Sequence, residues 1–278
     1  MKTTLMGSGY IGSEFFRQNQ NSVMVNERDN YVPQSSKILY TISTTHNYHI
    51  FKRPHLDIDT NLSTLIAVLE NARLVYGEDV DFTFLSSWFV YGKQETFPVK
   101  ENAPCNPTGF YSITKLAAER LLASYCETYG MKYRILRLCN VIGGNDPDMG
   151  RKKNALQYMI SRLVQDKEIN LYEGDVIRDY LNVRDVACAI KLAMSATFEN
   201  GVANIGSGNG YGYNIKNLVR YAHALTKKGI INSIPVPDFH KTVQTDKMIL
   251  NVEKISSLGF TPQYTIEDTI KEIIKNAA

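Results

Sequence analysis

Short apolar runs alternate with amphipathic stretches along the first half of the chain. The amphipathic stretches Asn61–Tyr76 and Ser112–Tyr129 repeat apolar residues at helical spacing, so these residues share one face. The alternation predicts an α/β fold of the doubly wound type, in which helices cover both faces of a parallel sheet. The runs that we expect to form strands are Thr3–Met6, Val23–Val25, Lys37–Ile42, Phe82–Leu85 and Tyr133–Leu138.

The connection between the second and third of these runs is unusually short. Only Glu27 to Ser36 separate them, whereas a parallel crossover usually needs a dozen or more residues. One strand-helix unit is therefore missing after the second strand. Ten extended residues still reach about 33 Å, enough to pass over the first strand and enter the sheet on its other side. We predict a sheet with a trimmed edge.

The order of elements loosens after Gly143. A basic helix start is expected at Arg151–Lys153, followed by a short strand at Ile169–Tyr172 and a helix at Val183–Met194. We interpret residues 1–143 as one domain and residues 144–278 as mainly a smaller lobe. Segments at about 176–206 are expected to return to the sheet of the first domain.

The composition is typical of a folded protein that binds small molecules. Of its 278 residues, 44% are hydrophobic, which allows a full core. The 31 basic and 28 acidic residues give a net charge of +3, and no long run of one sign predicts a nucleic-acid or membrane surface. No stretch approaches the roughly 20 apolar residues of a membrane span, and residues 2–6 resemble a strand rather than a signal peptide. We expect a soluble cytoplasmic protein.

The four cysteines predict neither a metal site nor a disulfide scaffold. They lie far apart, without the C-x-x-C pairs of a zinc site and without the density of a disulfide-rich domain. We interpret them as reduced, mostly structural thiols. They are Cys105, Cys126, Cys139 and Cys188.

A glycine-rich turn follows the first predicted strand. Residues 7–12 read G-S-G-Y-I-G, and the helical stretch Ser13–Gln18 comes next. In this context the first glycine permits a tight turn, the second lets a pyrophosphate approach, and the third lets helix and strand pack closely. The amino end of the helix attracts phosphates. The motif predicts dinucleotide binding rather than a purely structural turn, with contacts from Gly7, Gly9, Tyr10, Ile11 and Gly12.

The end of the second strand should contact the ribose of the cofactor. A carboxylate there favours NAD, and a basic residue accommodates the additional phosphate of NADP. Asn26 stands where the acid is expected, with Glu27 next to it, whereas Arg28 can bind a 2′-phosphate. The cofactor is therefore NAD or NADP, and Arg28 favours NADP, unless all of these are solvated turn residues. Ser43, after the third strand, is predicted as a further cofactor contact.

Tyr111 and Lys115 are four residues apart in a predicted helix and therefore lie on one face. A close ammonium and a cationic nicotinamide can together lower the pKa of a phenol from about 10. Tyr111 would then exchange a proton with a substrate hydroxyl while hydride moves to or from the nicotinamide. Ser87, at the end of the strand that begins at Phe82, can bind the same oxygen or simply cap the strand. We predict Ser87, Tyr111 and Lys115 as catalytic residues.

Taken in this order, the motifs resemble those of extended short-chain dehydrogenases/reductases of the NAD-dependent epimerase/dehydratase family. The resemblance covers nearly the whole chain and implies a Rossmann dinucleotide-binding domain followed by a substrate lobe. The matching residues are the glycine turn, Asn61, Ser86–Gly92, Tyr111 with Lys115, Arg137–Gly143, Arg178–Tyr180 and Leu258–Pro262.

The resemblance implies a partner as well, a nucleotide-diphosphate sugar. Ser87 and Tyr111 would contact its reacting hydroxyl, and Asn140 would lie beside the sugar nucleotide. Lys115 would hold the nicotinamide ribose in addition to polarising Tyr111. A homodimer is also implied, through helices at 63–76 and 112–129, although the apolar residues of these helices could equally belong to the core.

Further substrate contacts are implied in the smaller lobe. Arg178 would bind the diphosphate, which suits the geometry of a guanidinium; the alternative is a local ion pair with Asp179. Asn154 resembles another phosphate contact, for which Lys152 and Lys153 compete.

The two residues after Ser87 restrict the reaction. Dehydratases of the family place Asp and Glu there, and fucose-synthase-like members place a cysteine two residues after the serine, but this chain has Trp88 and Phe89. Neither side chain can transfer those protons. Hydride chemistry at one sugar carbon remains, in a nucleotide-sugar 4-epimerase or in an NADPH-dependent reductase of a 4-keto-sugar nucleotide. A non-catalytic dinucleotide sensor is a further alternative.

Overall fold

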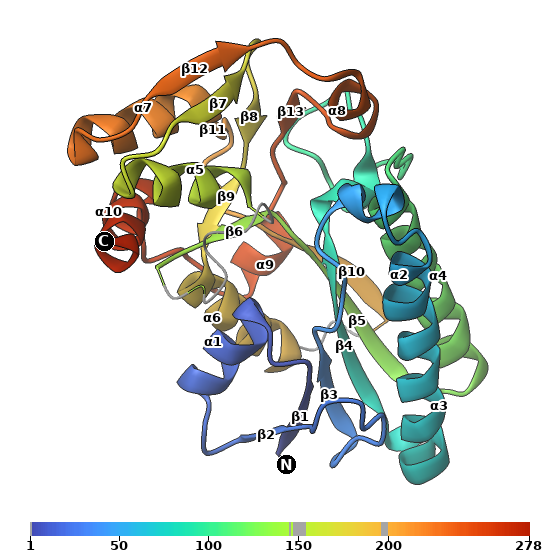
Figure 1. Ribbon diagram of the computed structural model, residues 1–278. Helices are drawn as coiled ribbons and strands as arrows, with labels where there is room; N and C mark the ends of the chain where they lie inside the picture. Colours follow the sequence, from blue (N-terminus) through green and yellow to red (C-terminus); the bar gives the residue numbers. More distant parts are fainter. Residues whose placement is uncertain (1, 145, 147–153, 196–199) are drawn as a thin grey trace.

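A six-stranded parallel sheet with helices on both faces forms the centre of the molecule (Figure 1). The computed structural model describes residues 2–144, 146, 154–195 and 200–278. The strands run in the order β10-β5-β4-β3-β1-β2, so the predicted doubly wound Rossmann fold is confirmed. Their bounds are β1 (Thr3–Met6), β2 (Val23–Val25), β3 (Lys37–Tyr40), β4 (Asp81–Ser87), β5 (Lys132–Leu138) and β10 (Gly201–Ile205).

The trimmed edge predicted from the short connection is confirmed. β2 and β3 pair with opposite sides of β1, where Thr4 faces both Met24 and Ile38. Residues 26–36, all described, cross between them without helix or strand. Polar contacts within the connection hold it: Asn26 Nδ2 donates to Asn30 O (2.6 Å), and Gln34 Nε2 donates to Asn26 Oδ1 (3.1 Å).

Strand periodicity divides the core into one layer on each side of the sheet. In β3, Leu39 faces one layer while Ile38 and Tyr40 face the other, as the period of two requires. Helices α1, α6 and α9 cover the first layer, and α3 and α4 cover the second. Their bounds are α1 (Tyr10–Gln18), α6 (Val183–Ser195), α9 (Glu253–Ser257), α3 (Thr64–Tyr76) and α4 (Phe110–Thr128).

The helix before β4 begins earlier than its apolar pattern predicts. Helical structure starts at His55 instead of Asn61, because polar residues such as the buried Asp57 lie in its first turns and hide the periodicity. It passes through a π-helical segment that carries Asn61. Short elements in this region are η1 (Asn47–Phe51), α2 (His55–Ile58), η2 (Asp59–Ser63), η3 (Gly77–Asp79) and η4 (Trp88–Tyr91).

The smaller lobe sits at the carboxyl ends of the large sheet (Figure 1). It has its own apolar core and three small sheets, with strand pairs β6–β9 and β7–β12 and the triplet β11-β8-β13. The strands are β6 (Asn140–Ile142), β7 (Ile169–Tyr172), β8 (Ile177–Arg178), β9 (Tyr180–Asn182), β11 (Tyr213–Asn214), β12 (Ile231–Ile234) and β13 (Lys247–Met248). The helices are α5 (Ala155–Val164), α7 (Ile215–Thr226), α8 (Asp238–Val243) and α10 (Ile266–Ala277).

Part of the second half of the chain belongs to the large sheet. β10 pairs with β5, and α6 covers one face, whereas β8 and β9 pair within the small sheets. The division at residue 143 stays a prediction. The expected helix start at Arg151–Lys153 lies outside the described residues. Among the residues that are described, no helix is both long and apolar enough to cross a membrane.

A buried ion pair joins α4 to the sheet. Arg137 of β5 donates three hydrogen bonds to Glu119 of α4, from Nε to Oε1 (3.0 Å) and Oε2 (3.2 Å) and from Nη2 to Oε2 (2.6 Å). Ser86 Oγ, in β4, donates to the same carboxylate at 2.5 Å. The Arg137 guanidinium also lies 4.7 Å from the centre of the Tyr91 ring. Two strands and one helix therefore meet at Glu119.

Replacing Glu119 with alanine should destabilise the protein strongly, because it leaves the Arg137 guanidinium buried and unpaired. We expect the free energy of unfolding in urea to fall by about 3–5 kcal/mol. Asp238→Ala is the matched control: it removes the partner of Lys241 in a pair whose side chains are 61% and 99% exposed, so the loss should stay below about 1 kcal/mol. Equal losses for the two variants would contradict this prediction.

Candidate active site

The glycine turn has the shape that a bound pyrophosphate requires. Gly7 adopts a positive φ of 102°, and a methyl group on Gly12 would come within 2.2 Å of the Gly7 carbonyl oxygen. A methyl group on Gly9, in contrast, would meet nothing within 4 Å. Gly9 is also the N-cap of α1, where no side chain among the described residues caps the helix. The backbone N–H groups at this end of α1 can therefore donate hydrogen bonds to phosphate oxygens.

The two residues inside the turn pack in different directions. Ile11 lies partly buried against the core layer of α1 and α6. The Tyr10 hydroxyl lies beside Gly143, directly after β6, since a methyl group on Gly143 would meet it at 2.8 Å. Burial raises the pKa of Tyr10. Their predicted contacts with the cofactor stay predictions.

The end of β2 carries a buried amide, Asn26, where the acid is expected, followed by Glu27. Asn26 is buried and both polar atoms of its amide are engaged within the connection, with Asn30 and Gln34. Glu27 and Arg28 are exposed. The amide of Asn26 would have to exchange a partner to bind a ribose hydroxyl, whereas the Arg28 side chain is accessible to a phosphate.

Tyr111 lies in the first turn of α4, against the carboxyl end of β4. Its side chain is 7% exposed, and burial raises the pKa of Tyr111 to about 12. The nearby hydroxyls of Ser87 and Ser43 oppose this rise. Ser87 Oγ also accepts a hydrogen bond from Phe89 N–H (3.3 Å), so it caps the strand end as well. The structure thus brings Ser43, predicted only as a cofactor contact, next to the tyrosine.

Lys115 lies one helical turn beyond Tyr111 and is 1% exposed. Its ammonium donates to the carbonyl oxygen of Leu85 (2.7 Å) and lies 4.0 Å from the centre of the Phe84 ring. Burial lowers the pKa of Lys115 to about 7, and the charge of Glu119 opposes the shift. A cation held at the end of β4 is placed to bind the ribose and to stabilise an ionised phenol.

A polar network below Tyr111 escaped the sequence analysis. Asn61 Nδ2 donates to Thr114 Oγ1 (3.0 Å) and to Thr44 Oγ1 (2.9 Å), and Thr44 Oγ1 in turn donates to Asp57 Oδ1. The Asn61 side chain reaches α4 from the π-helical segment, a distortion that is common at functional sites. The family motif marked Asn61, but no signal in the sequence linked it to Thr44 and Asp57.

The predicted substrate residues of the lobe make mostly local contacts. Asn140 Nδ2 donates to Asp179 O (3.0 Å). Asn154 is the N-cap of α5: its Oδ1 accepts from Gln157 N–H (3.3 Å), and its Nδ2 donates to Val141 O (3.0 Å). Both polar atoms of Asn154 are therefore engaged. Its competitors for the phosphate role, at positions 152 and 153, lie outside the described residues.

Arg178 is a buried cation whose hydrogen bonds go to carbonyl oxygens. Its guanidinium donates to Ile177 O (3.0 Å) and to Thr245 O, and it lies 5.0 Å from the centre of the Trp88 ring. Burial lowers the pKa of Arg178 to about 10. In the described part of the chain it forms no ion pair, and Asp179 instead accepts from Ser207 N–H (3.0 Å). A guanidinium in this state attracts a phosphate.

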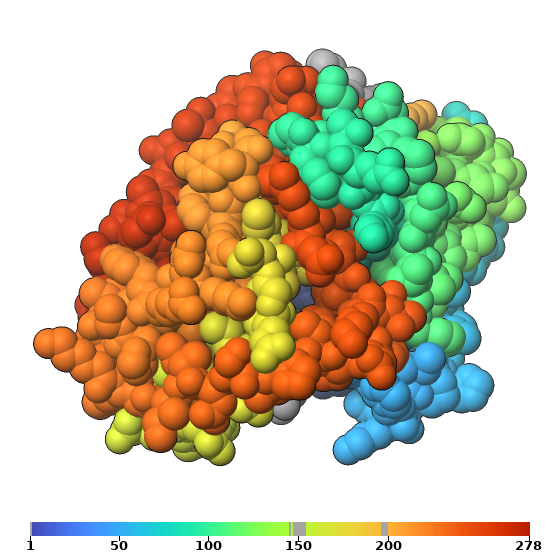
Figure 2. Space-filling model, turned by 90° about the horizontal axis from the view of Figure 1, so that it is seen from above, coloured from blue at the N-terminus to red at the C-terminus, as the bar shows by residue number. Residues whose placement is uncertain are grey.

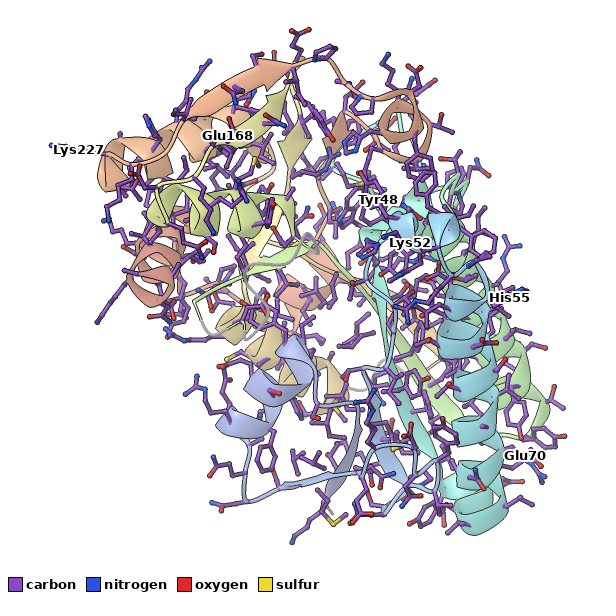
Figure 3. All side chains as sticks on the ribbon, viewed as in Figure 1. Tyr48, Lys52, His55, Glu70, Glu168 and Lys227 are labelled. Atoms are coloured by element: carbon purple, nitrogen blue, oxygen red, sulfur yellow. The ribbon has the colours of Figure 1, made fainter. Side chains whose placement is uncertain are left out.

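Aromatic side chains join α8 of the lobe to η1 of the first domain. Tyr48, labelled in Figure 3, has its hydroxyl oxygen 2.9 Å from His240 Nδ1. The ring of Phe239 lies 5.5 Å from that of Tyr48 and 4.6 Å from that of Phe51. Figure 2 shows the blue chain around η1 beside the orange-red chain that includes α8. η1 also contacts α4, because Asn47 Oδ1 accepts a hydrogen bond from the backbone N–H of Ser112, the residue after Tyr111 (3.3 Å).

The fold and this arrangement define a dinucleotide-binding α/β protein of the short-chain dehydrogenase type. The glycine turn, the buried lysine and the hydroxyl cluster fit a nicotinamide dinucleotide at the carboxyl end of the sheet. The chain belongs to the NAD dependent epimerase/dehydratase family, whose sequence profile matches residues 34–206.

Named relatives agree with this family. The chain is 28% identical over 227 residues to a putative UDP-glucose 4-epimerase of Methanocaldococcus jannaschii, covering 80% of this chain and 70% of the relative. It is 27% identical over 227 residues to the UDP-glucose 4-epimerase of Corynebacterium glutamicum, covering 76% and 67%.

Solved structures share the fold over the full length. UDP-glucose 4-epimerase from Thermus thermophilus, in complex with NAD, superposes with a TM-score of 0.86 at 21% identity, covering 100% of this chain and 99% of that one. RMD from Pseudomonas aeruginosa, complexed with NADPH, gives a TM-score of 0.84 at 18% identity, with coverage of 100% and 99%. One of these two structures contains NAD and the other contains NADPH.

The depressed pKa of Lys115 should appear in the pH dependence of stability. Because an unfolded lysine titrates near 10.4 and folded Lys115 at about 7, the unfolded chain binds the additional proton between these values. Stability contributed by Lys115 therefore rises with pH in this window. The test compares the cofactor-free wild type with the variant Lys115→Met. Between pH 7.5 and 9 the free energy of unfolding of the wild type should rise, relative to that of the variant, by up to about 1.4 kcal/mol per pH unit. If the free energy of unfolding in urea instead changes with pH in the same way for both proteins, Lys115 keeps an ordinary pKa.

Proposed function

We propose that the protein is a nucleotide-sugar 4-epimerase that uses Ser87, Tyr111 and Lys115. The observation that carries this proposal is the placement of buried Tyr111 beside Ser87, at the end of β4, and one helical turn from the buried ammonium of Lys115. The relatives named UDP-glucose 4-epimerase support the substrate class. A proton relay has no use in a binding module, so we disfavour a non-catalytic sensor.

The residues of the chain would carry the proton through both halves of the reaction. A bound nicotinamide dinucleotide supplies a hydride acceptor that later returns the hydride. Tyr111, once ionised, takes the proton of the sugar hydroxyl as the carbon is oxidised, and Ser87 holds that oxygen by a hydrogen bond. Tyr111 gives the proton back when the carbon is reduced from the opposite face. The Lys115 ammonium would bind the ribose and lower the pKa of Tyr111.

The side chains beside Ser87 support single-carbon hydride chemistry. Trp88 is 3% exposed, and its ring stacks on that of Phe89 with 3.8 Å between the centres. No carboxylate or thiol occupies either position, so elimination of water and epimerisation beside a ketone lack their proton-transfer groups.

The substrate is proposed to bind through its diphosphate at Arg178. This guanidinium is buried without an ion-pair partner among the described residues, so a phosphate would supply the missing charge. Asn140, in the strand that pairs with β9, would contact the sugar nucleotide nearby.

We propose that the cofactor is NAD or NADP, with NADP slightly favoured. Asn26 stands in place of the acid that would repel a 2′-phosphate, and Arg28 is exposed after it, as Glu27 is. An NADPH-dependent 4-keto-sugar reductase is the second candidate. The observation that favours it is the helix-free connection 26–36, which removes one strand-helix unit beside the adenosine and so favours a cofactor that is released at each turnover.

The helices α3 and α4 are proposed to form a homodimer interface. Their inner faces pack on the sheet, but apolar side chains also remain exposed on their outer faces. Exposed apolar patches of this kind are typical of interaction surfaces. The residues concerned are Leu74 and Val75 of α3, Ile113 and Leu121 of α4, and Tyr129 directly after α4.

Tyr111→Phe should abolish turnover while cofactor binding is retained. Removing the hydroxyl eliminates the proton relay, and we expect conversion of UDP-glucose to UDP-galactose to fall at least about 100-fold. Native mass spectrometry checks that the variant binds the dinucleotide as the wild type does, and it separates the candidates, since retained NAD favours the epimerase and an empty site the reductase. Undiminished turnover would overturn the assignment of Tyr111.

Arg28→Ala should weaken NADPH binding and leave NADH binding nearly unchanged. The guanidinium would contact only the 2′-phosphate, and losing one exposed charge pair should raise the Kd for NADPH about fivefold. Titration of the cofactor fluorescence measures both constants. Arg53→Ala, another exposed arginine far along the chain, controls for net charge. A parallel loss for both cofactors would place Arg28 outside the 2′-phosphate site.

A further inference from the structure

A row of stacked side chains connects the proposed diphosphate site to the catalytic tyrosine. The Arg178 guanidinium packs on Trp88 (5.0 Å), Trp88 stacks on Phe89 (3.8 Å), and Phe89 stands edge-on to Tyr111 (6.0 Å between ring centres). If Arg178 binds the diphosphate and Tyr111 meets the reacting hydroxyl, the sugar must lie along the two rings between them. This step rests on the function proposed above.

A cavity opens beside the same two rings. It has a volume of about 210 Å³ and lies between η4, the loop that precedes α4, and α8 with the two residues after it. Phe89 is shared: its ring borders the cavity and also contacts Tyr111. The volume is far larger than the 10–15 Å³ that a single water needs, but it is below the 300 Å³ at which ordinary ligand sites begin. The cavity therefore fits part of a substrate rather than a whole nucleotide sugar.

The charged residues that border the cavity in the described part of the chain are basic. Its lining includes the side chains of Lys93 and Lys241, and neither aspartate nor glutamate is among the described residues that border it. Lys241 forms an ion pair with Asp238 (3.0 Å), but both side chains are well exposed, and pairs of this kind are weak. Lys93 is exposed as well. A negative group that enters the cavity can therefore recruit both ammonium groups.

We propose that this cavity is a subsite for a carboxylate carried by the sugar, so that the preferred substrate is a nucleotide-activated acidic sugar such as a uronic acid. The partly exposed ring of Phe89 supports the apolar face of the sugar ring. Lys93 and Lys241 bind the carboxylate of the sugar. On the same sugar, the hydroxyl that faces Tyr111 is only a few bonds from this carboxylate. The two lysines thus determine specificity and take no part in proton transfer.

Binding of two UDP-sugars to the wild type, saturated with NAD, tests the subsite. Isothermal titration calorimetry should give a Kd for UDP-glucuronate about tenfold below that for UDP-glucose. In the double variant Lys93→Met, Lys241→Met the two constants should become nearly equal, through weaker binding of UDP-glucuronate alone. Methionine retains most of the side-chain length, and both positions are exposed, so folding should be unaffected.

Lys247→Met is the matched control. It removes the same charge from the strand that follows α8, but the Lys247 ammonium lies over the Phe97 ring (4.8 Å) and does not border the cavity. This variant should keep the tenfold preference. The proposal is overturned if wild type binds both sugars equally, or if the preference survives in the double variant.

Two further outcomes separate this inference from the proposed function. If the double variant loses affinity for both sugars by the same factor, the lysines bind the diphosphate, and the carboxylate subsite is wrong while the nucleotide-sugar function stands. If NAD binds but neither UDP-sugar does, the proposed function fails and the subsite fails with it.

Discussion

The contact of Arg137 with Glu119 fixes the catalytic helix relative to the sheet. Glu119 lies one turn beyond Lys115 on α4, and its carboxylate binds both the β5 arginine and the hydroxyl of Ser86 at the end of β4. A helix packed only through apolar contacts could shift along its axis at little cost, whereas this bidentate contact allows a single position. In that position the first turn of α4 brings Tyr111 to Ser87.

The parallel α/β fold could be predicted because its strands are short apolar runs separated by amphipathic stretches of helical spacing. The ten-residue gap before Lys37 was informative as well, since chain length alone excluded an ordinary crossover. The candidate catalytic residues were found by spacing: four residues between Tyr111 and Lys115 define one helical face, and a strand end precedes Ser87. Buried Glu119, four residues after Lys115, carried the same signal and could have been found in this way.

The rest of the site depends on contacts that leave no local pattern. Ser43, Thr44 and Asp57 lie in a polar stretch without periodicity, and their approach to Tyr111 and Asn61 is set by the π-helical segment. In the lobe, β8, β11 and β13 have two residues each and pair across long sequence separations. Two residues cannot display an alternation, so neither the strands nor the surroundings of Arg178 were predictable.

The loss of a strand-helix unit moves β2 to the border of the sheet. A border strand offers unpaired backbone amides and carbonyls to any other extended chain, which is the usual origin of edge-to-edge aggregation. β2 has only three residues, and the chain that follows folds back on it, where Gln34 Nε2 donates to Val25 O (3.2 Å). The protein has lost an outer strand-helix unit but remains protected from self-association at this border, because β2 is too short to pair with a strand of another molecule.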